Sequence, residues 1–171
     1  MAAAPDRWLL LLGSNLDREA SMARALRRLG ERFPVLARSR VVETDAVGDP
    51  DGPRFHNRAV LVRAGGTAEG MRDLLHGIEA ALGRDRSAGR NAPRTMDIDI
   101  LLAVDAAGSV LAEPPVHRDL RRHHYAALPA AEIAGDLVLP ADGGTVAAAA
   151  RALGAAPAGL RVLEAEPVTG G

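Results

Sequence analysis

Two aspartates separated by one residue are the strongest chemical signal in the sequence. Asp97 and Asp99 lie in the apolar segment 95–104, whose pattern predicts a strand. Side chains of a strand alternate between its faces, so both carboxylates point the same way. Two like charges on an apolar strand need a partner, and magnesium prefers carboxylate oxygens and phosphates. The pair therefore predicts a magnesium site, although an exposed edge strand with aspartates in water or paired with arginines is the alternative.

A run of arginines precedes this strand. Arg84, Arg86, Arg90 and Arg94 lie in a segment that also contains Gly83. Guanidinium groups donate hydrogen bonds in pairs and remain charged, which suits phosphate oxygens. The alternative is a solvated charged loop. Several cations next to two carboxylates favour a triphosphate with metal ions between the two groups.

A second candidate site lies earlier in the chain. Asn57 follows Phe55 on one face of the predicted strand 55–64. A side-chain amide both donates and accepts hydrogen bonds, which suits the edge of a planar heterocycle, and Phe55 offers a packing surface. Alternatively, the loop backbone satisfies Asn57. Glu79 and the polar stretch 117–124 are further candidates for nucleotide contacts, with an exposed surface role as the alternative.

The elements expected to position these residues alternate as strand, helix, strand, strand, helix, strand. This is the split β-α-β order of a ferredoxin-like α+β fold, with extra elements following the βαββαβ core. We expect one domain over 1–171, a frayed tail at 1–6 and an Ala/Gly-rich C-terminal extension at 141–171 that packs on the core. The predicted strands are 8–12, 35–44, 55–64, 95–104 and an edge strand within 159–163, and the predicted helices follow caps at Asp17 and Thr67 and span 146–153.

Composition excludes several classes of protein. The chain has 171 residues, 47% hydrophobic residues, a net charge of −1 and no cysteine. Disulfides, thiolate catalysis and Cys-based zinc sites are excluded, and the charge gives no support to nucleic-acid or membrane binding. No apolar run approaches the ~20 residues of a membrane span. We expect a cytoplasmic protein, and a basic side chain that binds phosphate must be Arg or His because the chain has no Lys.

Taken together, the motifs resemble the family of 6-hydroxymethyl-7,8-dihydropterin pyrophosphokinases, enzymes of folate biosynthesis. The most specific motif is the segment 93–101, Pro-Arg-Thr-Met-Asp-Ile-Asp-Ile-Leu, and Leu-Gly-Ser-Asn-Leu at 12–16 adds independent weight. Further matches occur in order at 43–48, 55–60, 78–84, 117 and 128–138.

The resemblance implies an αβα three-layer sandwich and transfer of pyrophosphate from ATP to the pterin hydroxymethyl group, with release of AMP. It implies two magnesium ions on Asp97 and Asp99. Apart from the resemblance, we expect a monomer. Roles implied for other residues are phosphate contacts and catalysis for Arg84 and Arg94, ATP contacts for Glu79, Ile100, His117 and Arg118, and a pterin pocket of Thr44, Val47, Phe55, Asn57 and Tyr125.

Several positions depart from the family pattern, mostly on the nucleotide side. They are Asp45, Asn91, Ala112, Arg118 and His123. These departures keep open a second hypothesis, a catalytically weakened paralogue that binds pterin. A third hypothesis, an RNA-binding module on a ferredoxin-like sheet, lacks the exposed aromatic side chains that such modules stack on bases, since aromatics are 2% of the chain.

Overall fold

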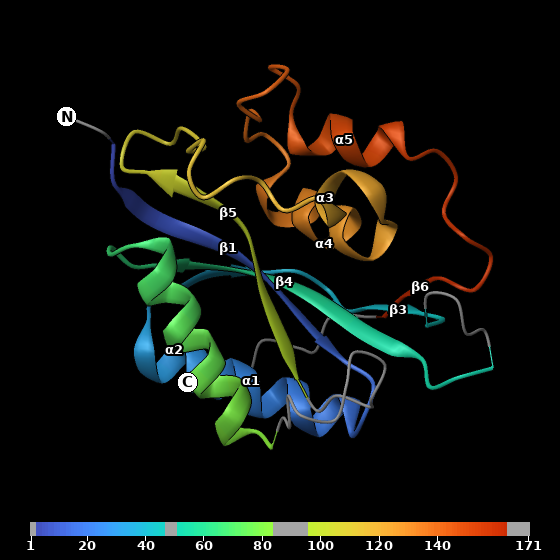
Figure 1. Ribbon diagram of the computed structural model, residues 1–171. Helices are drawn as coiled ribbons and strands as arrows, with labels where there is room; N and C mark the ends of the chain where they lie inside the picture. The colour runs from blue at the N-terminus through green and yellow to red at the C-terminus, as the bar shows by residue number, and fades with distance from the viewer. Residues whose placement is uncertain (1–2, 47–50, 84–95, 164–171) are drawn as a thin grey trace.

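The computed structural model describes residues 3–46, 51–83 and 96–163. An antiparallel sheet runs through the molecule, with helices on both faces (Figure 1). The elements are β1 (Pro5–Ser14), α1 (Arg18–Arg32), β2 (Val35–Arg38), β3 (Val42–Thr44), β4 (Phe55–Arg63), α2 (Ala68–Ala81), β5 (Asp97–Asp105), α3 (Asp119–Arg122), α4 (His124–Ala134), α5 (Val146–Ala152) and β6 (Arg161–Val162).

The sheet has the order β5-β1-β4-β3-β6 within the described ranges, and β2 also pairs with β4. One strand was expected over 35–44, but the structure divides it into β2 and β3. The division is at Ser39, whose hydroxyl accepts a hydrogen bond from the Ala59 amide at 2.9 Å, in the position where a strand would offer a backbone carbonyl. The Ser39 carbonyl instead accepts from Nε of buried Arg58 at 2.6 Å. These side-chain bonds satisfy the backbone where the regular ladder stops.

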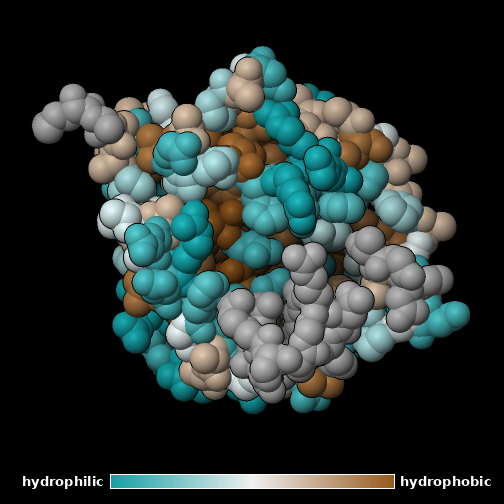
Figure 2. Space-filling model, in the orientation of Figure 1, coloured by the Kyte–Doolittle hydropathy of each residue, from teal (hydrophilic) through white to brown (hydrophobic). Residues whose placement is uncertain are grey.

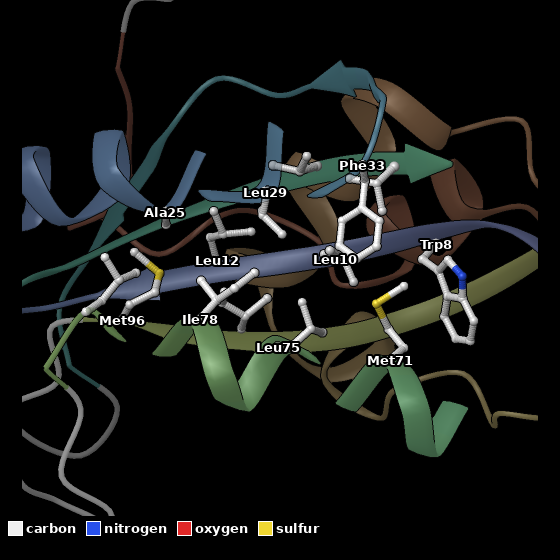
Figure 3. Close-up of a cluster of buried hydrophobic side chains, with 14 of the residues drawn as sticks. Trp8, Leu10, Leu12, Ala25, Leu29, Phe33, Met71, Leu75, Ile78 and Met96 are labelled. Carbon is white, nitrogen blue, oxygen red and sulfur yellow. The ribbon is translucent and has the colours of Figure 1, made fainter. Parts of the chain in front are cut away.

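Helices α1 and α2 cover one face of the sheet, and α3, α4 and α5 cover the other (Figure 1). Alternate residues of β1 supply both cores: Trp8, Leu10 and Leu12 point toward α1 and α2, as Figure 3 shows, whereas Leu9 and Leu11 pack against α4. A central strand buried on both faces explains the continuous apolar run at the start of the sequence.

A bulge interrupts the alternation in β5. Leu10 of β1 pairs with Ile100, but Leu9 pairs with Leu102, so one extra residue is accommodated on β5. Leu101 and Leu102 consequently both join the α4 side of the core. The bulge begins after the two aspartates. Asp97 and Asp99 therefore lie on the same face of the strand, as the sequence predicted.

The element ends differ from expectation at the N-terminus. Strand β1 begins at Pro5, inside the segment expected to be frayed. Asp17 occupies the N-cap position of α1 but adopts a left-handed conformation and makes no side-chain capping bond, whereas the Thr67 hydroxyl caps α2 as expected, accepting from the Gly70 amide at 3.1 Å.

The chain after β5 packs back on the sheet. Val146 and Ala150 of α5 are buried, and β6 pairs with β3 at the position where an edge strand was expected. No helix in the described ranges is both long enough and apolar enough to cross a membrane.

Candidate active site

Three strands bring the two sequence-predicted sites together at one end of the sheet. Gly13 of β1 pairs with Asp97 on one side and with Asn57 on the other. In the next row, Leu11 lies between Asp99 and Ala59. The aspartates and Asn57 share the sheet face that carries Leu11 and Ala59, the face covered farther along by α4. The metal candidates and the heterocycle candidate are therefore separated only by the width of one central strand.

The two aspartates repel each other in a partly desolvated position. Burial and, next in size, the neighbouring charge of Asp97 together raise the pKa of Asp99 from its ordinary value of 3.8 to about 6. Nearby His117 acts in the opposite sense and favours the charged carboxylate. A bound cation would relieve this repulsion, so the donor set and its electrostatics fit a divalent metal ion.

Two carboxylates are a small donor set for a metal. Across the residues that the structure describes, no group of three or more His, Asp or Glu side chains could hold a metal ion. Magnesium is commonly bound by one or two carboxylates, with water and substrate phosphates as the other ligands. The pair therefore suits a metal that arrives with a phosphate substrate better than a permanently held structural metal.

Asn57 is a buried polar group over a glycine. Its side chain is 6% exposed, and its Oδ1 lies 2.8 Å from where a Cβ on Gly13 would stand. No side-chain hydrogen bond of the Asn57 amide is found among the described residues, yet neither of its polar atoms is fully buried and unpaired, so the amide keeps some contact with solvent. A ligand that covers this amide must pair with it, because an unpaired amide in a closed site costs free energy. Gly13 thus provides the space in which Asn57 reaches across the sheet toward Asp97.

The other expected pterin residues on the sheet lie beside Asn57. Thr44 of β3 pairs with Phe55 of β4, and both side chains are half-buried. Val42 pairs with Asn57 and is buried. Val47, which was also expected in the pterin pocket, lies outside the described residues.

A hydrogen-bonded group from the loop after β5 and from α3 and α4 faces the aspartates. The phenol of Tyr125 donates to Oδ2 of Asp119 at 2.7 Å, and the backbone amide of Asp119 donates to Nδ1 of His117 at 3.2 Å. The His117 amide in turn donates to the carbonyl of Leu101 at 2.8 Å, which ties this loop to β5. Because Nδ1 accepts, the proton of a neutral His117 ring is on Nε2, which is free to act as a donor.

Glu79 contacts the outer edge of β5, the edge that faces away from β1. Glu79 of α2 is 1% exposed, and its Oε1 accepts from the Ile98 amide at 2.8 Å. Glu79 therefore supports the backbone between the two aspartates from the opposite face. By strand alternation the peptide groups of Ile100 also point to this edge, while its side chain packs against the core under α1 and α2. A nucleotide contact of Ile100 would use its backbone.

The remaining expected residues differ in what the structure says of them. Arg118 is 77% exposed at the start of α3, with Nε 3.8 Å from Asp119 Oδ1. Arg84 and Arg94, the expected phosphate cations, lie outside the described residues. Figure 2 shows hydrophobic atoms between two hydrophilic rims on this side of the molecule, one over α2 and one over α3 and α4.

Two of the departures from the family pattern make definite contacts. Asp45 accepts from Nη1 of Arg54, and the imidazole of His123 stacks on the Tyr125 ring with centroids 4.9 Å apart. Ala112 is exposed, and Asn91 lies outside the described residues.

Sequence reasoning did not single out Asp119 or the spatial role of Gly13. Asp119 stands two residues after His117 in a stretch rich in charged residues, which resembles an ordinary surface. The His-x-Asp spacing was the available signal, but only the turn into α3 brings the two side chains together.

Comparison with known proteins agrees with this arrangement. Residues 9–135 match the model of the 7,8-dihydro-6-hydroxymethylpterin-pyrophosphokinase family. The chain is 39% identical over 136 residues to the 2-amino-4-hydroxy-6-hydroxymethyldihydropteridine pyrophosphokinase of Methylorubrum extorquens, covering 78% of this chain and 85% of that one. The corresponding protein of Pseudomonas aeruginosa is 31% identical over 138 residues, or 79% and 85% of the two chains.

The fold comparison reaches more distant proteins. The crystal structure of wild-type Plasmodium falciparum HPPK-DHPS with pteroate superposes with a TM-score of 0.63 at 11% sequence identity. The match covers 89% of this chain but only 43% of the other, so the chain spans less than half the length of that protein. The similarity supports a mixed α+β fold of this type. Because the family model matches residues 9–135 and a relative is 39% identical, the chain belongs to the 7,8-dihydro-6-hydroxymethylpterin-pyrophosphokinase family.

Proposed function

We propose that the protein transfers pyrophosphate from ATP to the hydroxymethyl group of 6-hydroxymethyl-7,8-dihydropterin in folate biosynthesis. The family match and the names of the relatives support this activity. The observation that carries it is the row Asp97, Gly13, Asn57. It puts an amide with no side-chain hydrogen bond to the described residues one strand away from a repelling pair of carboxylates. A heterocycle that is hydrogen-bonded to the Asn57 amide would hold its hydroxymethyl group near the phosphates of ATP.

The pterin pocket in this proposal is the end of β3 and β4 with the start of α4. Asn57 completes its hydrogen bonds on the heterocycle edge, while Thr44 and Phe55 form the adjoining wall. Tyr125 closes the pocket from the helical layer, and Val47 completes it. A purely apolar ligand would leave the Asn57 amide unpaired, so the pocket favours a ligand with donors and acceptors on one edge.

Asp97 and Asp99 hold two magnesium ions in the proposal, and these ions would neutralise the triphosphate and orient it for attack. Burial and the charge of Asp97 raise the pKa of Asp99 to about 6, so a bound cation would favour its ionised form. Glu79 holds the peptide between them in place through Ile98. The chain itself thus supplies two oriented carboxylates on a supported strand.

ATP binds along the outer edge of β5 and toward α3. The Nε2 proton of His117 can donate to a phosphate oxygen, and the peptide groups of Ile100 can meet the adenine edge. Arg84 and Arg94 contact the phosphates and stabilise the charge that develops on them. Glu79 and Arg118 complete the proposed nucleotide site.

The reaction forms a bond between the pterin hydroxyl oxygen and the β-phosphorus of ATP. The bond from that phosphorus to the oxygen bridging the α-phosphate breaks, and AMP leaves with the electron pair. The hydroxyl proton passes to solvent water. We assign the fold that carries out this step to the ferredoxin-like class with a three-layer αβα arrangement, supported by the strand order and by helices on both faces of the sheet.

The test is release of AMP from ATP with magnesium, measured with and without hydroxymethyl dihydropterin. We expect pterin-dependent release, and its loss in Asp97→Ala and Asp99→Ala while the circular dichroism spectrum stays native. Asp73→Ala, at an exposed aspartate of α2, is the matched control and should retain activity. A protein that binds pterin but releases no AMP would instead support the weakened paralogue.

A further inference from the structure

The chain's single tyrosine is held at two points. Tyr125 lies in the first turn of α4, where its ring stacks on His123 with an interplanar angle of 12°. Its hydroxyl donates to Oδ2 of Asp119 at 2.7 Å, the short distance of a bond to an ionised acceptor. Stacking defines the plane of the ring, and the hydroxyl bond defines its direction. The ring therefore has little freedom even before a ligand arrives.

Asp119 is in turn part of the site and faces it. Its charge reaches both Asp99 and Tyr125. Its backbone amide donates to His117, and Arg118 lies 3.8 Å from Oδ1. Oδ2 accepts from the phenol at 2.7 Å and lies 4.0 Å from Nδ1 of His117, so the phenol is its shorter contact. The charge of Asp119 is repelled by that of Asp99, and the hydrogen bond from the Tyr125 phenol offsets part of that cost.

We propose that Asp119 is a positioning residue that fixes the Tyr125 ring over the pterin pocket. This inference rests on the proposed function, which makes that ring one wall of the pocket. A freely rotating ring would lose side-chain entropy on binding, whereas one already held by Asp119 and His123 does not. Asp119 therefore acts on the affinity for pterin through Tyr125, without touching the substrate.

The chain allows a direct spectroscopic measurement of this contact. Tyr125 is the only tyrosine, so the phenolate absorbance reports on it alone. Burial raises the pKa of Tyr125 above its ordinary value, and the hydrogen bond to Asp119 and the charges of Asp119 and Asp99 raise it further, while Arg118 opposes them. Asp119→Asn and Asp119→Ala should both move phenol ionisation down toward the ordinary range near pH ~10. The surface variant Asp142→Asn, which alters a separate exposed pair with Arg121, should not.

Binding measurements complete the test. Calorimetry should show pterin affinity lowered about 10-fold in Tyr125→Phe and in Asp119→Ala, the lower range for losing a hydrogen bond to a charged group. The double variant should be no weaker than either single variant, because both remove the same contact. In Tyr125→Phe the ATP affinity should change little, because this variant leaves both the backbone bond and the side chain of Asp119 beside His117 in place.

Each outcome has a distinct meaning. Phenol ionisation that is unchanged in both Asp119 variants would overturn the contact itself. A shifted ionisation with unchanged pterin affinity, or additive losses in the double variant, would overturn the positioning role. A wild-type protein that binds no pterin would overturn the proposed function, whereas the phenol titration would still test the contact between Asp119 and Tyr125.

Discussion

Replacing Asp99 with Asn should stabilise the ligand-free protein while ending pyrophosphoryl transfer. Burial and the charge of Asp97 raise the pKa of Asp99 from 3.8 to about 6, so the folded state disfavours its ionised form. At neutral pH the protein nevertheless carries that charge. Asparagine keeps the shape and removes the charge, and with it any contribution to metal binding.

The size of the stabilisation follows from the shift. About two pKa units correspond to about 3 kcal/mol, at ~1.4 kcal/mol per unit. Asp97 shares in the repulsion and relaxes when its neighbour becomes neutral, and the new amide needs its own partners. We therefore expect a gain of about 2 kcal/mol at pH 7. For a chain of this length that is a rise in melting temperature of roughly 4–8 °C.

The gain must depend on pH in one direction. The carboxyl of the unfolded chain loses its proton near pH ~4 and that of the folded chain near pH ~6, so between these values the unfolded chain binds fewer protons. Wild-type stability therefore falls as pH rises through this window, and Asp99→Asn escapes the fall. The stabilisation should be small below about pH 4 and complete above about pH 6.

The measurement is urea unfolding with a metal chelator present, followed by fluorescence of Trp8, the only tryptophan and fully buried. Asp73→Asn, which makes the same change in charge at an exposed site, should change stability by less than about 0.5 kcal/mol. Equal or lower stability of Asp99→Asn at pH 7, or the same gain at pH 4 as at pH 7, would refute the reasoning.

Three further predictions concern the supports of the site. Gly13→Ala should lower pterin affinity about 10-fold in calorimetry while leaving unfolding cooperative, because its Cβ would stand 2.8 Å from Oδ1 of Asn57; unchanged affinity would remove Asn57 from the pocket. Glu79→Ala should lower the free energy of urea unfolding by about 1–3 kcal/mol and weaken magnesium-ATP binding. Glu79→Gln keeps an acceptor for the Ile98 amide and should therefore retain most of the stability and most of the affinity. Equal losses in the two variants would argue against this support. Arg54→Ala should speed hydrogen exchange in β6, because its guanidinium bonds the segment before that strand; unaltered exchange would show that β6 is held by its pairing with β3 alone.

The sequence predicted the features that depend on local pattern. Alternation along a strand placed Asp97 and Asp99 on one face, and the same rule placed Phe55 and Asn57 together. Thr67 was identified as a cap because its side chain needs only the amide three residues ahead. Each of these inferences uses neighbours within a few residues, where the backbone geometry is already known once the element type is known.

The features that escaped prediction depend on distant segments. The break at Ser39 exists because its hydroxyl and carbonyl meet Ala59 and Arg58 of β4. The bulge after Asp99 arises from how β5 pairs with β1. The role of Asp119 needs the turn that brings it to Tyr125. None of these contacts leaves a periodic signal in the sequence.

Unfavourable features gather at one corner of the described structure. Two buried polar groups elsewhere show the contrast: Nε1 of Trp8 donates to the Ala64 carbonyl at 2.9 Å, and Ser39 bonds to β4. Nε of Arg7, at the far end of β1, is a buried atom without a hydrogen bond, but the same guanidinium donates to the Asp105 carbonyl through Nη2.

At the corner where β1 ends, the raised pKa of Asp99 makes its ionised form costly, the Asn57 amide has no side-chain hydrogen bond to the described residues, and Gly13 leaves space between them. A sequence that was optimised only for folding would remove each of these at little cost, for example with Asn at 99 or Ala at 13. Their presence together, in one row across three strands, is explained if cations and a polar heterocycle complete them. Ligands that complete these groups recover the stability that the ligand-free fold gives up. The features that weaken the ligand-free fold are therefore those that make the ligand-bound site specific.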